Sequence, residues 1–191
     1  MLKTFVAALL YTALMLAAIP APALDAPGLR DLREGTMRKL EIHDTPRDIN
    51  TVSITDLDGA VDDLAQYAGK LVIVNLWATW CVPCRVEMPA LDALAAEYGD
   101  DGLVVLPIAT GRNAKRAITE FYKEANITTL PIRLDPKGQL ARELGVFGLP
   151  GTIVISPEGK EIARMKGDAE WFSQSARAIV DALLAEMPQD E

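Results

Sequence analysis

The sequence predicts one α/β domain in which a central mixed β-sheet is flanked by helices. The run from Leu71 to Leu76 is apolar at every position except Asn75, which is typical of a central strand buried on both faces. Predicted strands and helices alternate in the order β-α-β-α-β-α-β-β-α, a pattern that favours helices covering a sheet. A turn at Pro157 to Lys160 joins the last two strands, so we expect them to form an antiparallel hairpin.

The elements of this domain are expected between residue 71 and the C-terminus. Strands are predicted at Leu71 to Leu76, Leu103 to Ile108, Ile132 to Leu134, Thr152 to Ile155 and Glu161 to Met165. Helices are predicted from the cysteines to Gly99, from a cap at Asn113, from Gln139 to Leu144, and from a cap at Asp168 with Phe172 on the buried face. Pro107 lacks a backbone donor, so it belongs near a strand end or on an edge.

Residues 1–23 are predicted to be a signal peptide or a membrane anchor. Lys3 supplies a positive start, Phe5 to Ile19 is largely apolar, and Ala21-Pro22-Ala23 resembles a cleavage site. The apolar stretch is 15 residues long, shorter than the roughly 18 to 20 of a spanning helix, which favours a cleaved signal over a retained anchor. Both readings place the remaining chain outside the cytoplasm, in the periplasm.

Residues 24–50 are interpreted as an N-terminal arm or linker, and residues 51–191 as the domain itself. Met37 to Ile42 is a possible edge strand, and Thr51 to Ile54 followed by Asp56-Leu57-Asp58-Gly59 predicts an extra N-terminal β-hairpin. His43, the only histidine, lies in this leading region, far in sequence from the cysteines. We assign it no role.

Charge excludes two classes of partner. Without residues 1–23 the chain carries 18 basic and 27 acidic side chains, a net charge of −9. Nucleic acid and anionic membrane surfaces both require clustered Lys and Arg, so neither is an expected partner.

Cys81 and Cys84 are the only cysteines, and they are placed where the first buried strand passes into a helix. Cys81 precedes the helix, near its free backbone amides and the positive end of its dipole, which favours a thiolate. We therefore expect Cys81 to attack a disulfide and Cys84 to resolve the mixed disulfide that results. The intervening Val82-Pro83 restricts the loop between them.

Other chemistries remain open for a lone CxxC motif. A structural disulfide and half of a zinc site are the simplest alternatives, although two cysteines and the remote His43 do not supply four zinc ligands. A peroxidatic cysteine would be preceded by Pro and Thr at positions seven and three residues earlier, where this chain has Val74 and Ala78. Disulfide exchange by Cys81 and Cys84 requires no metal and no separate cofactor.

Two further features favour redox chemistry. Leu149-Pro150, followed by Gly151-Thr152, has the form of a cis-proline turn that leaves backbone free to pair with a substrate chain; an ordinary trans proline is the alternative. Glu87 lies one helical turn after Cys84 on the same face. It is a candidate base for the Cys84 proton, with a solvated helix glutamate as the alternative.

The segments WATWCVPCRVEMP (residues 77–89) and GLPGT (residues 148–152) resemble the TlpA/ResA/CcmG group of thioredoxin-like proteins. The resemblance runs from about Asp56 to the C-terminus, and the EGTMRKL block at residues 34–40 is most similar to TlpA. It implies a thioredoxin-like fold with a cis-proline facing the disulfide. It also implies an active-site surround formed by Trp80, Val82, Pro83, Leu149 and Pro150.

The same resemblance assigns roles near the cysteines. Glu87 aligns with an acid tied to the resolving cysteine, and Pro89 aligns with a proline that bends the active-site helix. Asn75 departs from thioredoxin proper, which has a buried aspartate at this place. If Asn75 cannot take a proton, Glu87 is the remaining local candidate for that task.

The function implied is an extracytoplasmic thiol-disulfide oxidoreductase kept reduced by a membrane thiol transporter. TlpA-like proteins reduce cysteines of copper-delivering and copper-receiving partners in oxidase assembly, and ResA-like and CcmG-like proteins reduce apocytochrome c. The expected partner is accordingly a copper chaperone, an oxidase subunit or apocytochrome c. A copper-binding chaperone that uses Cys81 and Cys84 as ligands is the alternative.

Overall fold

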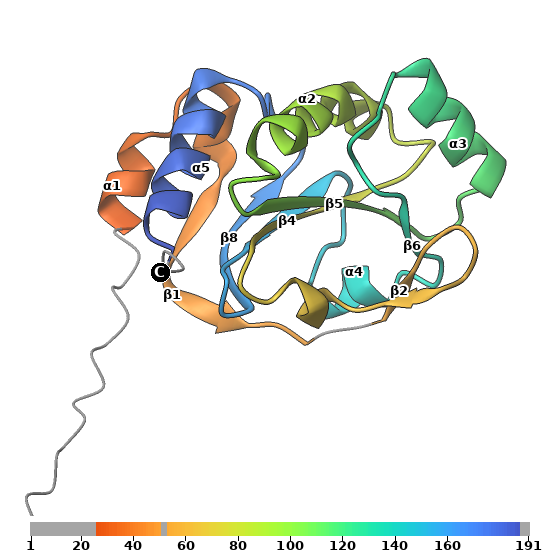
Figure 1. The fold of residues 1–191 in the computed structure, drawn as a ribbon, viewed down its shortest axis with the longest axis horizontal. Helices are drawn as coiled ribbons and strands as arrows, with labels where there is room; N and C mark the ends of the chain where they lie inside the picture. The colour runs from red at the N-terminus through yellow and green to blue at the C-terminus, as the bar shows by residue number, and fades with distance from the viewer. Residues whose placement is uncertain (1–25, 51–52, 188–191) are drawn as a thin grey trace, which may run out of the picture.

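The computed structural model describes residues 26–50 and 53–187 of the 191-residue chain. Within these residues, eight strands form one mixed sheet in the order β1-β8-β7-β4-β5-β6-β2-β3, and helices cover both of its faces (Figure 1). The predicted export segment, residues 1–23, lies outside the described residues. The predicted α/β class and the mixed sheet are confirmed.

The middle of the sheet follows the predicted order of elements. β4 (Leu71–Trp77), β5 (Leu103–Thr110) and β6 (Arg133–Asp135) run parallel to one another. β7 (Gly151–Ile155) pairs antiparallel with β4, and β8 (Lys160–Lys166) pairs antiparallel with β7. β4 therefore lies at the centre of the sheet, and its carboxyl end leads directly into the cysteine segment.

Pro107 differs from the expectation that it lies near a strand end or on an edge. It lies inside β5, directly opposite Asn75 of β4. On the other side of β5, pairing with β6 begins only at Ile108. An amide at this position that faced β6 would have no ladder partner, and proline is tolerated inside a strand at such a position.

Residues 26–48 are folded onto the domain and do not form a free arm. α1 (Ala26–Asp31), a 3₁₀ turn (Gly35–Lys39) and β1 (Glu41–Asp48) precede the core, and β1 forms one edge of the sheet beside β8. Leu29, Met37 and Leu40 are buried in the core because α1 and the turn pack beside α5 (Figure 1). The predicted strand over Met37 to Ile42 thus begins only at Glu41.

The extra N-terminal hairpin is confirmed, and it occupies the opposite edge of the sheet. β2 (Ile54–Thr55) and β3 (Val61–Asp62) pair antiparallel across the Asp56 to Gly59 turn, and β2 also pairs with β6. Residues 51–52, which belong to the predicted strand, lie outside the described residues.

Five helical segments follow the hairpin. They are a 3₁₀ turn (Leu64–Tyr67), α2 (Val82–Tyr98), α3 (Lys115–Glu124), α4 (Gln139–Glu143) and α5 (Gln174–Ala185). No helix in residues 26–50 and 53–187 is both long enough and apolar enough to cross a membrane.

Two of the predicted helix caps are wrong. Ala114, not Asn113, precedes the first residue of α3, and it makes no side-chain cap bond. α5 starts after Ser173, whose hydroxyl accepts the amide of Ala176 at 3.2 Å, so Asp168 lies before the helix. Phe172 consequently precedes α5 and is partly exposed. A capping side chain must reach the second or third helical amide, and only Ser173 lies close enough.

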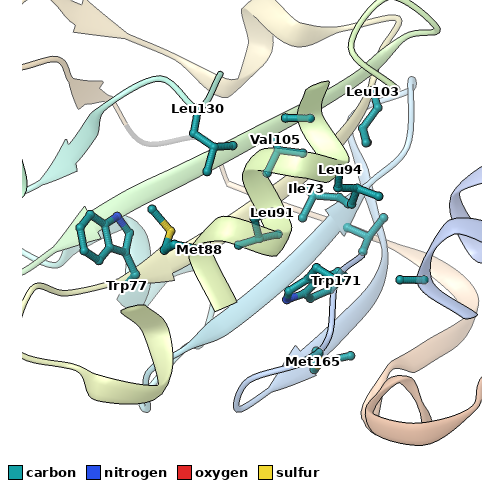
Figure 2. Packing of buried hydrophobic residues seen from close by; sticks show 14 of the residues in the cluster. Ile73, Trp77, Met88, Leu91, Leu94, Leu103, Val105, Leu130, Met165 and Trp171 are labelled. Carbon is teal, nitrogen blue, oxygen red and sulfur yellow. The ribbon is translucent and has the colours of Figure 1, made fainter. Parts of the chain in front are cut away.

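The core consists of two layers, one on each side of the sheet. α2, α3 and α5 pack on one face, and α4 with the 3₁₀ turn at residues 64–67 packs on the other. Figure 2 shows Met88 of α2 beside Trp77, and Leu91 and Leu94 further along the helix on the side of Ile73 of the sheet. This packing holds the N-terminus of α2 at the carboxyl end of β4.

Candidate active site

The two cysteines lie at the start of α2, where the sequence predicted them. Cys81 is the N-cap residue of α2, its Cα lies 5.3 Å from that of Cys84, and a disulfide joins the two side chains. The Sγ of Cys81 also accepts the backbone amide of Cys84 at 3.3 Å. A thiolate at Cys81 would keep this donor and the positive helix terminus, both of which favour its ionised form.

The two cysteines differ in access. Cys84 is completely buried, whereas Cys81 retains 5% of its accessible surface. Of the two cysteines, Cys81 is therefore the one nearer to solvent.

A hydrogen-bonded clamp orients the segment between β4 and Cys81. The side-chain Oδ1 of Asn113 accepts the backbone amide of Thr79 at 2.8 Å and its hydroxyl at 3.0 Å. The amide Nδ2 of Asn113 donates to the carbonyl of Thr110 at 3.0 Å, at the end of β5. Asn113 therefore ties the cysteine loop to the neighbouring strand instead of capping α3.

The predicted cis bond between Leu149 and Pro150 is present. Strand register explains its position, because Gly151 of β7 pairs with Leu76 of β4 in an antiparallel ladder. Pro150 directly precedes Gly151, and Trp77 directly follows Leu76, so the cis bond lies at the end of β4 that leads into the cysteine segment. Pro150 is buried, and Leu149 is partly exposed.

Glu87 is buried, with 2% of its surface accessible, and so it is not a solvated helix residue. Its Oε1 accepts Asn75 Nδ2 at 2.8 Å, and its Oε2 accepts the Ala169 amide and Trp171 Nε1, both at 3.0 Å. Burial raises the pKa of Glu87 to about 7, while the three hydrogen bonds act in the opposite direction. The group can therefore change its protonation state near neutral pH.

Asn75 reaches Glu87 because of strand alternation. Successive residues of β4 face opposite layers, so Asn75 shares the α2 face with Ile73 and Trp77. Its Nδ2 also donates to Thr152 Oγ1 at 3.0 Å, since Thr152 is its partner across the β4–β7 ladder. The Oδ1 of Asn75 is buried without a hydrogen-bond partner among the described residues.

Sequence reasoning missed Ala169 and Trp171, which hold one oxygen of Glu87. Both lie in the segment between β8 and α5, more than 80 residues after Glu87. Trp171 carried a usable signal, because a buried indole N–H normally requires an acceptor. Nothing in the local pattern, however, identifies Glu87 as that acceptor.

Exposed apolar side chains flank Cys81 in the chain and also occur in the loop that precedes Pro150. Trp80 and Val82 are 67% and 70% exposed, and Phe147, in the loop before Pro150, is 90% exposed. Pro83 is exposed in the first turn of α2. Exposed aromatic and aliphatic side chains gathered around a reactive group are typical of a surface that binds another protein.

In the described part of the chain, no three His, Cys, Asp or Glu side chains gather into a possible metal-binding group. His43, which the sequence places far from the cysteines, lies on β1 and contacts Glu161 of β8.

The sequence model of the AhpC/TSA family matches residues 46–163. The thiol-disulfide oxidoreductase ResA of Bacillus thuringiensis subsp. konkukian is 30% identical over 137 residues, which are 72% of this chain and 78% of ResA. The thioredoxin-like protein YneN of Bacillus subtilis is 35% identical over 107 residues, which are 56% of this chain and 62% of YneN.

Solved structures show the same fold. A thiol:disulfide interchange protein of the thioredoxin family from Chlorobium tepidum aligns with a TM-score of 0.62 and 26% identity, over 73% of this chain and 97% of that one. The exposed lipoprotein thioredoxin Etrx1 of Streptococcus pneumoniae aligns with a TM-score of 0.58 and 30% identity, over 70% and 98%. The family match at residues 46–163 contains both cysteines, Glu87 and Pro150, whereas His43 precedes it.

Proposed function

Since this chain belongs to the AhpC/TSA family and is a thiol-disulfide oxidoreductase, we propose that it acts outside the cytoplasm as a specialised reductant of cysteines in particular partner proteins. One observation carries the proposal: the redox pair lies at a helix N-terminus, with Cys81 at the N-cap and 5% exposed and with Cys84 completely buried. This difference supports attack by Cys81 and resolution by Cys84.

The reaction begins with both cysteines reduced. The Cys81 thiolate attacks one sulfur of a partner disulfide, which forms a Cys81–partner bond and releases the other partner sulfur as a thiolate that takes up a proton. Cys84 then loses its proton and attacks Cys81 Sγ, so the partner leaves with its second thiol. Two electrons pass to the partner, and the enzyme ends with the Cys81–Cys84 disulfide seen in the structure.

Glu87 is the proposed acceptor of the Cys84 proton. It lies one turn further along α2 and, with its pKa near neutral, can take a proton at the pH of the reaction. Glu87 also lines a groove of about 390 Å³ with Ala90 and Glu170, through which the proton can exchange with solvent.

The Glu87 role is tested by the pH dependence of the resolving step in a single turnover. Glu87→Gln should shift the pH profile for release of the second partner thiol. Glu170→Gln is the matched control, because it removes an exposed acid from the same groove. An unchanged profile in Glu87→Gln would remove Glu87 from the mechanism.

Partner binding is assigned to the apolar surface around the cysteines together with the backbone at Leu149-Pro150. Proline offers no amide hydrogen, so the neighbouring backbone is free to pair with an extended segment of the partner. Trp80, Val82 and Phe147 then cover apolar side chains of that segment.

The expected partners are the copper chaperone or oxidase subunit of cytochrome oxidase assembly, or apocytochrome c, with a membrane thiol transporter as the upstream reductant. This choice rests on the likeness of residues 77–89 and 148–152 to the TlpA/ResA/CcmG group. The predicted export segment at residues 1–23 supports a periplasmic location.

A Cys84→Ala variant tests both the chemistry and the partner. Without its resolving thiol, the enzyme should remain bound to partners through Cys81, and mass spectrometry of the trapped complexes identifies them. A copper protein would select oxidase assembly, and a cytochrome would select cytochrome c maturation. Cys81→Ala is the matched control, which should trap little.

Two outcomes would contradict the proposal. Preferential trapping on Cys84 in the Cys81→Ala variant would reverse the assigned roles. Stoichiometric Cu(I) binding by the reduced protein, without any disulfide exchange, would favour the copper-binding chaperone instead.

A further inference from the structure

A buried ionic triad joins β1 to β8 on the side of the sheet where the cis-proline loop lies. Arg164 donates from Nε to Glu161 Oε1 at 2.5 Å and from Nη2 to Glu161 Oε2 at 2.6 Å. His43 Nε2 lies 2.6 Å from the same Oε1. The Glu161 and His43 side chains are almost completely buried, and that of Arg164 is 18% exposed.

The triad holds Arg164 in one position. Burial alone would raise the pKa of Glu161, but the hydrogen bonds from Arg164 and His43 outweigh it and place this pKa below its ordinary value. Glu161 is therefore ionised, and a bidentate pair between a carboxylate and a guanidinium has a defined geometry. This pair therefore fixes the directions in which the remaining N–H groups of Arg164 point.

One of those donors reaches the loop that leads to Pro150. Arg164 Nη2 donates to the carbonyl of Leu144, at the end of α4, at 3.2 Å. Such a carbonyl has no partner within the helix and needs one elsewhere. At the other end of the loop, the amide of Gly167 donates to the carbonyl of Pro150 at 2.9 Å. Residues 145–149 thus span two anchors, one on β8 and one directly after it.

Between these anchors, the amides of Gly145 and Val146 donate to the carbonyls of Arg142 and Ala141, and the Val146 and Leu149 side chains pack against the core. A cavity of about 250 Å³ is bounded by residues 145–151 on one side and by residues 164–167 on the other. The Phe147 side chain is 90% exposed and so adds little to the packing of the loop. Across this cavity, the bonds from Arg164 and Gly167 are the ones that tie the loop to β8 and to the residue after it.

We propose that Arg164 is a positioning residue for disulfide exchange, because its bonds to Glu161 and Leu144 place the loop that presents Leu149-Pro150 to a partner polypeptide. The inference rests on the proposed function, in which a partner segment pairs with this backbone. His43 acts through Glu161, so the N-terminal strand β1, whose first part precedes the family match, contributes to the site.

The test compares two disulfides with the same leaving group. One is a synthetic peptide whose single cysteine is joined to thionitrobenzoate, and the other is the symmetrical dithiobis(nitrobenzoate). Both release coloured thionitrobenzoate when Cys81 of the reduced enzyme attacks, but only the peptide can pair with the loop. The ratio of the two second-order rate constants therefore measures the contribution of the loop.

Arg164→Met keeps much of the side-chain stem and removes every donor. We expect the peptide reaction to slow about 10-fold, since small misplacements of a binding group cost factors of this order or more, while the reaction with the symmetrical reagent stays within about two-fold. Arg164→Lys should restore part of the peptide rate. Arg116→Met, which breaks an exposed pair with Glu120 on α3, is the matched control and should leave both rates unchanged.

The His43 contribution is tested by a double-mutant cycle. His43→Asn should lower the peptide rate less than Arg164→Met does, and it should have no further effect in the Arg164→Met background, because it acts through Arg164. An equal loss with both disulfides, or independent effects of the two substitutions, would overturn the proposal.

If Arg164→Met does not fold, His43→Asn alone tests the proposal. It must then lower the ratio of the rate constant for the peptide to that for the symmetrical reagent. Amide exchange gives a second measurement: residues 145–149 should exchange faster in each variant, and unchanged exchange would contradict the bracing role. Failure of the proposed function has a different signature, since the reduced wild-type protein would then show no preference for the peptide disulfide over the symmetrical reagent.

Discussion

The buried carboxyl of Glu87 should make the stability of the oxidised protein depend on pH. In the folded protein its pKa is raised from 4.5 to about 7, mainly by burial. The folded state therefore binds this proton more tightly than the unfolded state does. Its contribution to stability is fully present below about pH 4.5 and is lost as the pH rises through about 7.

The size of the effect follows from the shift in pKa. The folded and unfolded values differ by about 2.5 units, and each unit corresponds to about 1.36 kcal/mol. The Glu87 contribution to the free energy of unfolding should accordingly decrease by about 3 kcal/mol between pH 4.5 and pH 8. Almost no solvent reaches the carboxyl, so screening does little to reduce this figure.

The perturbation is Glu87→Gln, which keeps the shape of the side chain and removes its titration. The carbonyl oxygen of the introduced glutamine can accept the bonds from Ala169 and Trp171. The Asn75 amide can then rotate, so that its unpartnered Oδ1 accepts from the new amide group. The variant should therefore fold, with a weaker dependence of stability on pH.

Urea unfolding of the oxidised proteins at a series of pH values measures the difference between wild type and variant. Other titrating groups are common to both proteins and cancel in the comparison. The difference in unfolding free energy should change by about 3 kcal/mol across the range, in favour of Glu87→Gln at high pH. Parallel profiles for the two proteins would refute the reasoning and show that Glu87 does not titrate in this range.

Three further substitutions test the packing around the site by urea unfolding. Met88→Ala removes a completely buried side chain beneath the first turns of α2 and should cost about 2 to 5 kcal/mol. Gly151→Ala places a Cβ 2.4 Å from Val146 Cγ1; it should cost about 1 to 3 kcal/mol, and Val146→Ala in the same chain should recover part of the loss. Asp92→Ala removes the carboxylate that accepts the amides of residues 128–130, so stability should fall by about 1 to 2 kcal/mol and these amides should exchange faster; an unchanged exchange rate would contradict the assignment.

Patterns within the chain were sufficient for the order of the elements and for the cysteine pair. The apolar run of β4 and the turn between β7 and β8 are local signals, and the CxxC spacing puts both sulfurs on one turn of α2. The cis bond before Pro150 was predicted from local pattern and family resemblance. Helix starts were less predictable, because Asn113 and Asp168 both have side chains that can cap, and neither does.

Local sequence patterns were not sufficient to predict how the segment before the hairpin packs on the domain. Residues 26–48 have little periodicity, yet Leu29, Met37 and Leu40 are buried. Their burial depends on contacts with α5 and β8, which lie far away in sequence. The same holds for His43, whose partner Glu161 is 118 residues away.

The sequence by itself identified the cysteine pair at a strand-to-helix junction, and its likeness to the TlpA/ResA/CcmG group predicted disulfide exchange, because both signals are local in the chain. Tertiary structure alone decided the environment in which they react. Strand register places Thr152 beside Asn75, and the segment after β8 brings Trp171 to Glu87. The burial of Glu87 and its hydrogen-bond partners depend on residues that are distant in the chain. Its raised pKa, and the support that Arg164 gives to the Pro150 loop, therefore exist only once the sheet has formed.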